Sequence, residues 1–273
     1  MPLNESELTF VRNFIREQAA IVLEPEKSYL IEARLQPLAR RAGFSSLGEL
    51  VATLRTKRHT ELQRKVIEAM TTNETSWFRD RHPFEALKNL VIPSLMEKRA
   101  KQKALTFWCA ASSSGQEPYS VLMVISEHFP QLLKSWKFRF IATDISHEML
   151  RRTRDGTYSQ IEINRGLPAP LLVRYFEKKG LYWQVKEELR KRIELRELNL
   201  AGTWPALPPI DVIFMRNVLI YFDVETKKQI LAKVRRVMRP DGCFFLGGAE
   251  TTVHLDDSFE RIPAAKTGCY RLK

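Results

Sequence analysis

Long apolar runs, metal-binding cysteine patterns and a glycine-rich phosphate loop are all missing from this sequence of 273 residues. No stretch approaches the roughly 18 apolar residues of a membrane-spanning helix, and the N-terminal MPLNESELTF lacks the basic and apolar regions of a signal peptide. The three cysteines, Cys109, Cys243 and Cys269, show no metal-ligand spacing and fall in apparent strands, as buried thiols of reducing compartments do. We therefore expect a cytoplasmic protein without a metal site or membrane insertion.

Acidic residues are scarce relative to basic ones. The formal net charge is +12, and basic residues exceed acidic ones between residues 31 and 104. Such a charge favours an acidic partner, but charge alone does not distinguish nucleic acid, lipid and an acidic protein face. Basic side chains on solvated helix faces account for part of the surplus.

The N-terminal part of the sequence is predicted to be helical throughout. Apolar residues recur at helical spacing from residue 6 to about residue 70, Ser6 is a suitable N-cap, and Thr60 opens a further helix. We expect a helical domain over residues 1–72, then a linker and connecting helix over residues 73–104, with the helix at His82–Ala100. The remaining length, residues 105–273, suits one larger domain.

The larger domain is organised around the segment TFWCAASSSGQEPYS. An apolar run at Leu105–Cys109 predicts a buried strand, five small residues follow, and Gly115 precedes a helical pattern. Small side chains let a ligand approach the backbone, and a helix N-terminus offers unpaired N–H groups. The G-x-G-x-x-G fingerprint is absent, so an ordinary strand-to-helix turn is the alternative. Asp144, at the end of the next apolar run, favours a nucleotide-type site, because an acid there can bind ribose hydroxyls.

The alternation of strands and helices is interrupted between residues 156 and 190. The pentapeptide LYWQV alternates like an exposed strand after Gly180, which predicts a small antiparallel insertion. Strands resume at Arg192–Leu198 and Asp211–Met215, Asp223 is suited to cap the next helix, and Arg239–Gly242 is expected to form a turn. This order predicts an α/β fold with a mostly parallel sheet.

Four separated motifs resemble those of the CheR family of chemotaxis receptor methyltransferases, in the family's order and over nearly the whole chain. They are TTNETSWFRD, WCAASSSGQEPYS, ATDIS and IDVIFMRNVLIYF. The chain departs from the family's usual residues at Cys109–Ala111 and at Gly248–Ala249. The resemblance implies a Rossmann-like, S-adenosylmethionine-dependent methyltransferase fold with a seven-stranded sheet. It places a receptor-recognition function in the all-α N-terminal domain and a small β-subdomain at about residues 156–190 of the catalytic domain.

The resemblance also implies a reaction and a cofactor site. The reaction is methylation of chemoreceptor glutamates to methyl esters, which converts S-adenosylmethionine to S-adenosylhomocysteine. Arg79 is implied at the methionine end of the cofactor, where an arginine can bind the carboxylate through two charge-assisted bonds. The predicted cofactor-binding residues are Asn73, Thr75, Arg79, Glu117, Asp144, Asn199, Leu200, Arg216 and Asn217. For the last four, strand-end capping is the alternative.

No general base is expected in this reaction, because a glutamate with a pKa of about 4.3 is already ionised near neutral pH. Tyr221 is a catalytic candidate from the motif RNVLIYF, with core packing as the alternative. Glu250 is a second candidate for the wall of the site, with a surface position as the alternative.

The implied partner is the acidic methylation region of the chemoreceptor's cytoplasmic helical bundle, reached in membrane-embedded receptor arrays. Arg34, Arg40 and Arg41 can share or adjoin one face of a basic helix that contacts the receptor, with surface solubility as the alternative. Family members that bind a receptor's C-terminal pentapeptide tend to carry a glycine-rich loop in the small subdomain. Residues 183–190 contain no glycine, so tethering by such a peptide is not expected.

Two other function classes compete with this interpretation. A nucleic-acid methyltransferase would suit the basic charge, but LPPID has the wrong flanks for a base-binding clamp, so no nucleic-acid partner is expected. A non-catalytic receptor-binding module that retains the cofactor as a structural ligand is the second alternative.

Overall fold

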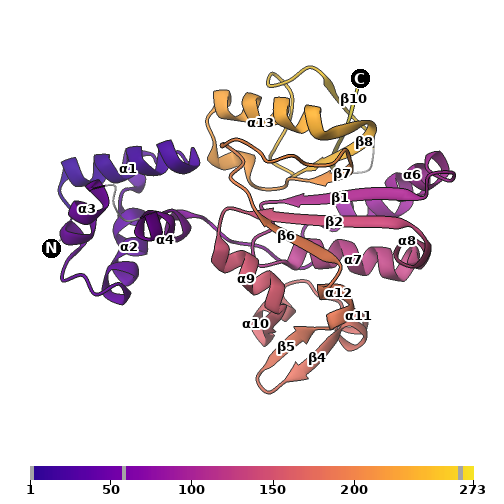
Figure 1. Ribbon diagram of the computed structural model, residues 1–273, viewed down its shortest axis with the longest axis horizontal. Coiled ribbons are helices and arrows are strands. Elements are labelled where there is room, and N and C mark those ends of the chain that lie inside the picture. The colour runs from indigo at the N-terminus through magenta and orange to yellow at the C-terminus, as the bar shows by residue number, and fades with distance from the viewer. Residues whose placement is uncertain (1–2, 57–59, 264–266) are drawn as a thin grey trace. The chain divides into compact units, whose positions relative to one another are not determined.

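The computed structural model describes residues 3–56, 60–263 and 267–273. The chain divides into two compact units (Figure 1). The first comprises Met1–Thr72 with Tyr221–Thr226, and the second comprises Asn73–Ile220 with Lys227–Lys273. No helix in the described ranges is long and apolar enough to cross a membrane, and the side chains described there include no His, Cys, Asp or Glu group that could hold a metal ion.

The first unit is helical, as the apolar spacing predicts. Its elements are α1 Glu5–Ala19, the 3-10 turn η1 Pro25–Lys27, α2 Tyr29–Arg41, α3 Leu47–Arg55 and α4 Thr60–Met70. Each α-helix buries one apolar stripe in a shared core that includes Val11, Ile31, Leu50 and Val66. The predicted cap at Ser6 is wrong. Asn4 caps α1 instead, because its side chain accepts the Glu7 N–H while the Glu7 carboxylate accepts the Asn4 N–H.

The second unit is built on a seven-stranded sheet with the order β6-β2-β1-β7-β8-β10-β9. The strands are β1 Ala104–Ala110, β2 Lys137–Asp144, β6 Ile193–Glu197, β7 Ile210–Phe214, β8 Met238–Leu246, β9 Phe259–Arg261 and β10 Gly268–Leu272. Pairing is parallel from β6 to β8, and β10 runs antiparallel to β8 and β9. Successive strands extend in opposite directions from β1 and β7, so the sheet's topological switch point lies between these two strands.

Helices cover both faces of this sheet. They are α5 His82–Ala86, the π-helical segment η2 Leu87–Val91, α6 Ile92–Lys98, α7 Gln116–His128, α8 Pro130–Ser135, α9 His147–Asp155 and α13 Val224–Val237. Figure 1 shows α7 and α13 on opposite faces, as right-handed crossovers on the two sides of the switch point require. Phe107 and Cys109 of β1 join the core beneath α7, while Trp108 points to the other face and is equally buried.

A small antiparallel sheet with the order β3-β5-β4 is inserted in the chain between β2 and β6 of the main sheet, as the sequence predicts. It consists of β3 Thr157–Ser159, β4 Phe176–Lys179 and β5 Tyr182–Val185, with the short helices α10 Gln160–Asn164, α11 Ala169–Tyr175 and α12 Glu187–Arg190 (Figure 1). The predicted fold class is therefore confirmed in both its sheets and in its helical N-terminal domain.

The turn expected at Arg239–Gly242 lies inside β8. Pairing with β7 jumps from Ile210–Met238 to Val212–Cys243, so the four intervening residues form an irregularity in a continuous strand. Asp241 is held there by two hydrogen bonds from Arg99, the nearer 2.5 Å long. This ion pair keeps the irregular segment attached to the sheet instead of forming a free turn.

Candidate cofactor site

The loop between β1 and α7, residues 111–115, forms one wall of the candidate site. Its backbone enters the left-handed region at Ala111, Ser113 and Gly115, where φ is 52°, 49° and 96°. A Cβ at Gly115 would lie 2.8 Å from a Thr153 side-chain carbon, so both conformation and packing require glycine. The Ser112 hydroxyl oxygen is buried and has no hydrogen-bond partner among the described residues, which leaves a polar group available at this loop.

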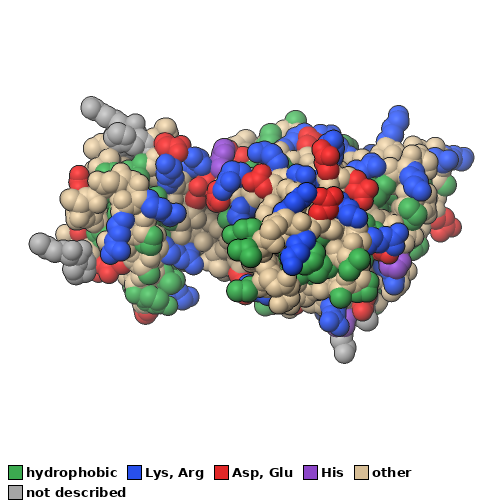
Figure 2. All heavy atoms as spheres, turned by 90° about the horizontal axis from the view of Figure 1, so that it is seen from below, with side chains coloured by type: hydrophobic (Ala, Val, Ile, Leu, Met, Phe, Trp, Pro, Cys, Tyr) green, Lys and Arg blue, Asp and Glu red, His purple; other side chains and the backbone are tan. Residues whose placement is uncertain are grey.

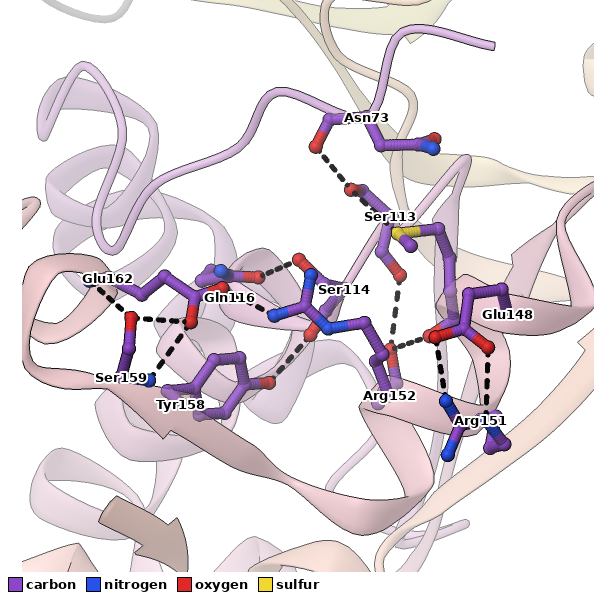
Figure 3. Close-up of polar contacts among 12 residues, drawn as sticks. Asn73, Ser113, Ser114, Gln116, Glu148, Arg151, Arg152, Tyr158, Ser159 and Glu162 are labelled. Atoms are coloured by element: carbon purple, nitrogen blue, oxygen red, sulfur yellow. Dashed lines mark hydrogen bonds and ion pairs between the residues drawn. The ribbon is translucent and has the colours of Figure 1, made fainter. Parts of the chain in front are cut away.

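Side chains from neighbouring segments hold the loop in place (Figure 3). The Tyr158 hydroxyl donates to the Ser114 carbonyl at 2.6 Å, and the Thr153 hydroxyl donates to the Ser113 carbonyl at 3.1 Å. The Ser113 hydroxyl donates to the Asn73 carbonyl at 2.8 Å, and in Figure 3 the Asn73 side chain points away from this bond. Asn73 is thus brought to the loop, although its contact with the cofactor remains a prediction.

Asp144 ends β2 beside this loop and is only 5% exposed. Its Oδ2 accepts the Ser113 N–H at 2.8 Å, and its Oδ1 accepts the Ser146 N–H at 2.9 Å. Asp144 therefore anchors the loop at the carboxyl end of β2, where an acid can bind ribose hydroxyls. The residues therefore fit a nucleoside ligand at this edge of the sheet.

Arg216, two residues after the end of β7, lies at the centre of a charged cluster and is 6% exposed. Its Nη1 donates to Glu117 Oε2 at 2.7 Å, and its Nη2 donates to Asp80 Oδ2 at 2.6 Å and to the Arg79 carbonyl at 3.0 Å. Burial raises the pKa of the Glu117 carboxyl, and the Arg216 guanidinium opposes that rise. Arg216 therefore joins three predicted site segments through protein contacts of its own.

Arg79 differs from Arg216 in having no carboxylate partner among the described residues. Its guanidinium donates to the Glu74 carbonyl at 3.3 Å, and its charge, like that of Arg216, opposes the rise in the pKa of Glu117 that burial causes. Arg79 and Thr75 are both partly exposed. The donor set suits a ligand carboxylate at Arg79, because two of the guanidinium's nitrogens remain open to it.

The loop after β6 carries Asn199 and Leu200. Leu198 donates its N–H to the Asp144 carbonyl at 3.0 Å, which places this loop beside the end of β2. The Leu200 carbonyl accepts from Trp204 Nε1 at 3.0 Å and from Lys233 Nζ at 2.7 Å. Sequence reasoning missed Lys233, which also donates to the carbonyls of Ala201 and Gly202, because its helical pattern gives no sign of a backbone partner 31 to 33 residues away.

The loop after β7 carries Asn217, whose φ is 59°. Its N–H donates to Glu250 Oε2 at 2.7 Å. The alternative of a surface position for Glu250 is wrong, since this side chain is buried with 8% exposure. Tyr221 is partly exposed, and its carbonyl accepts the Val22 N–H within the first unit. Its role as a catalytic candidate remains a prediction.

The three arginines predicted to contact a receptor lie in the first unit. The Arg34 guanidinium donates hydrogen bonds to the carbonyls of Met70 and Thr71 at 2.7 and 3.2 Å and to the Thr72 hydroxyl at 3.0 Å. Arg40 and Arg41 are exposed. Figure 2 shows Lys and Arg side chains spread over the visible face of each unit among acidic ones. Arg34 thus has a structural role at the end of α4 that the basic pattern did not reveal.

Fold and site together define a nucleotide-binding α/β domain, and comparison with known families identifies its class as an S-adenosylmethionine-binding methyltransferase domain. The family model described as the CheR methyltransferase SAM-binding domain matches residues 73–267, and the CheR all-alpha domain matches residues 6–71. The chain belongs to the CheR methyltransferase family, and its cofactor is S-adenosylmethionine.

Curated relatives support the same assignment over the full length. The chain is 41% identical to "Chemotaxis protein methyltransferase 1" of Pseudomonas aeruginosa, with 100% of both chains covered. It is 41% identical to "Chemotaxis protein methyltransferase Cher2" of Pseudomonas putida, with 96% of each covered. It is 31% identical to "Chemotaxis protein methyltransferase" of Escherichia coli, with 95% of this chain and 89% of the relative covered.

Proposed function

We propose that this enzyme transfers the methyl group of S-adenosylmethionine to glutamate side chains of chemoreceptors and forms glutamyl methyl esters. The observation that carries the proposal is the match of two CheR domains, all-α and SAM-binding, in order along nearly the entire chain. The names of the full-length relatives, which are chemotaxis protein methyltransferases, agree with it.

The cofactor, when bound, supplies an electrophilic methyl group on a sulfonium centre. We assign its methionyl carboxylate to Arg79, whose guanidinium has open donors, and its ammonium to Glu117, whose Oε1 has no partner among the described residues. Asp144 accepts the ribose hydroxyls, while Asn199, Leu200 and Asn217 border the adenosine. Asn73 and Thr75 complete the wall beside Arg79.

In this proposal the acceptor needs no deprotonation by the enzyme. A glutamate with a pKa of about 4.3 is an anion near neutrality, so an acceptor oxygen can form the new O–C bond directly. The bond between the methyl group and sulfur would break in the same step, with neutral S-adenosylhomocysteine as the leaving group. Aligning the reactants and excluding water is then the enzyme's main contribution, and ideal orientation can supply up to ~7–11 kcal/mol. Tyr221 remains our candidate side chain for this step, from its place in the motif RNVLIYF.

The proposed partner is the acidic methylation region of a receptor's cytoplasmic helical bundle. The exposed Arg40 and Arg41 of α2 supply the complementary charge, and the enzyme acts from the cytoplasm on receptor arrays. Binding to a receptor's C-terminal pentapeptide is not part of the proposal, because the segment from β5 to α12 contains no glycine-rich loop.

Identification of the product tests this function. The protein is incubated with methyl-labelled S-adenosylmethionine and receptor membranes, and the labelled receptor is then treated with mild base. A glutamyl ester releases its label as methanol, whereas a methylated amine or nucleic-acid base retains it. Base-stable label would overturn the glutamate assignment, and intact cofactor binding without receptor labelling would favour a non-catalytic module.

A further inference from the structure

Glu250 forms an unusual set of contacts just beyond β8. Its Oε2 accepts the N–H groups of Gly247 and Asn217, each at 2.7 Å, and its Oε1 accepts those of Val218 and Leu219 at 2.9 and 2.7 Å. One buried carboxylate therefore satisfies four backbone donors, three of which are consecutive in the loop after β7.

The four backbone N–H groups around Glu250 are best satisfied by an anion with two acceptor oxygens. The positive φ of Asn217 turns successive N–H groups toward one point, as in the backbone nests that bind anions. A carboxylate offers about four lone-pair positions, which matches the four donors. A glutamine at this position would offer one oxygen and would direct its own N–H donors toward backbone donors.

The loop held by Glu250 belongs to the methyl-transfer site. It begins next to Arg216, which holds Glu117 and the Arg79–Asp80 segment, and it leads into the 3-10 turn η3 Leu219–Tyr221. The Glu250 charge is close enough to contribute to raising the pKa of Glu117.

Gly247 allows the close approach between the end of β8 and this loop. A Cβ at Gly247 would lie 2.6 Å from Asn217 Nδ2, 2.7 Å from Glu250 Oε2 and 2.9 Å from the Asn217 backbone nitrogen. The adjacent Gly248 has nothing within 4 Å of its corresponding position. The chain thus offers two neighbouring glycines of which only one is pressed against the loop.

We propose that Glu250 is a positioning residue for methyl transfer, which fixes the Asn217–Leu219 loop in the geometry that aligns the acceptor without itself touching cofactor or acceptor. This inference rests on the proposed function, since the acceptor is taken to be a receptor glutamate. The carboxylate, ammonium and ribose of the cofactor are assigned to other segments, and only Asn217 of this loop borders the adenosine. The proposal therefore predicts a loss in kcat that is larger than any loss in cofactor affinity.

The test compares Glu250→Gln and Gly247→Ala with two matched controls, Gly248→Ala and Glu260→Gln. Glu260 lies on β9, is paired with Arg271, and has no contact with the loop. Single-turnover methylation of receptor membranes gives the rate, calorimetry with S-adenosylhomocysteine gives the cofactor affinity, and circular dichroism gives the folded fraction. Gly247→Ala keeps the Glu250 charge, so it tests the loop even if Glu250→Gln folds poorly.

We expect both loop variants to lose about 10- to 100-fold in rate per folded molecule, the loss typical of slight misplacement of reacting groups. Their cofactor dissociation constants should stay within about threefold of wild type, and both controls should match wild type. A wild-type rate in folded Glu250→Gln or in Gly247→Ala would overturn the proposal, as would a parallel loss of cofactor affinity. Base-labile ester formation by the wild type, measured in the same assay, reports separately on the proposed function.

Discussion

Arg79 and Arg216 are adjacent in the site but differ in what holds them. Arg216 is buried between Asp80 and Glu117, whereas Arg79 is partly exposed and bonded through its side chain to the Glu74 carbonyl. The sequence resemblance assigned both residues to the cofactor without distinguishing them. Their contacts indicate that Arg79 has donors available for a ligand and that Arg216 mainly organises the residues around it.

Substitution of Arg79 or Asp144 by alanine should therefore weaken cofactor binding. Loss of a charge-assisted hydrogen bond costs ~1.5–3 kcal/mol, which corresponds to roughly 10- to 100-fold in affinity. Asp144→Ala should also lower thermal stability, because the Ser113 and Ser146 N–H groups lose their acceptor. Calorimetric titration with S-adenosylhomocysteine measures the affinity, with exposed Arg81→Ala as the control. Unchanged dissociation constants in both variants would show that Arg79 and Asp144 do not bind the cofactor.

Lys233 should prove important for the cofactor although it lies outside every motif. Its ammonium donates to three consecutive carbonyls of the loop that carries Leu200. The Lys233 Nζ also lies over the Trp204 ring, 5.2 Å from the ring centroid, in a cation–π contact. Lys233→Met keeps the apolar stem and removes these hydrogen bonds, which stabilise the loop by ~1–2 kcal/mol. Cofactor affinity should therefore fall by about tenfold, because binding must then order the loop. Lys228→Met on the exposed part of α13 is the matched control. Equal affinity of Lys233→Met and wild type in the same titration would contradict this role.

At the level of elements, the buried strands and the helix after Gly115 could be predicted from apolar patterns alone. The strands β1 and β7 and the second half of β2 are buried on both faces, so each contains a short apolar run. Glu250 and Lys233 could not be predicted in this way, because their partners are backbone groups of distant loops. Backbone groups leave no sequence signal of their own, and only the folded chain brings them together.

The basic residues of helix α2 also include a contact with distant backbone groups that could not be predicted from the sequence. The basic pattern predicts one receptor-facing set, but Arg34 donates hydrogen bonds at the end of α4, while Arg40 and Arg41 are exposed. Charge patterns along a helix show which residues can share a face, but they do not show which of them find acceptors within the protein.

Charge reversal on α2 separates receptor recognition from catalysis. The double variant Arg40→Glu and Arg41→Glu should raise the receptor concentration needed for half-maximal methylation, while cofactor affinity stays unchanged. The wild-type rate should fall with added salt, because exposed charges are screened beyond ~8–10 Å at physiological ionic strength. The double variant Lys134→Glu and Lys228→Glu, which reverses exposed charges of the second unit, is the control. Wild-type methylation by the α2 variant at a limiting receptor concentration would contradict a role for Arg40 and Arg41 in receptor recognition.

At the level of the whole molecule, a basic chain carries a nucleotide-type site, and the proposed acceptor is already charged. The net charge of +12 suits association with an acidic receptor surface. The described residues of the site hold its loops through buried hydrogen bonds. The central claim is that alignment, and not activation of the nucleophile, drives methyl transfer.

The pH dependence of the single methyl-transfer step tests this claim most directly. A glutamate with a pKa of about 4.3 is about 99.8% ionised at pH 7, so the rate with saturating cofactor should be nearly level between about pH 6.5 and 8.5. Rapid quench of a single turnover keeps slow product release from masking the step. An amine or thiol acceptor, with a reference pKa of about 10.4 or 8.5, would instead gain up to about tenfold per pH unit below that value. A level profile supports the account, and a sustained unit slope through this window would show that some group must lose a proton first.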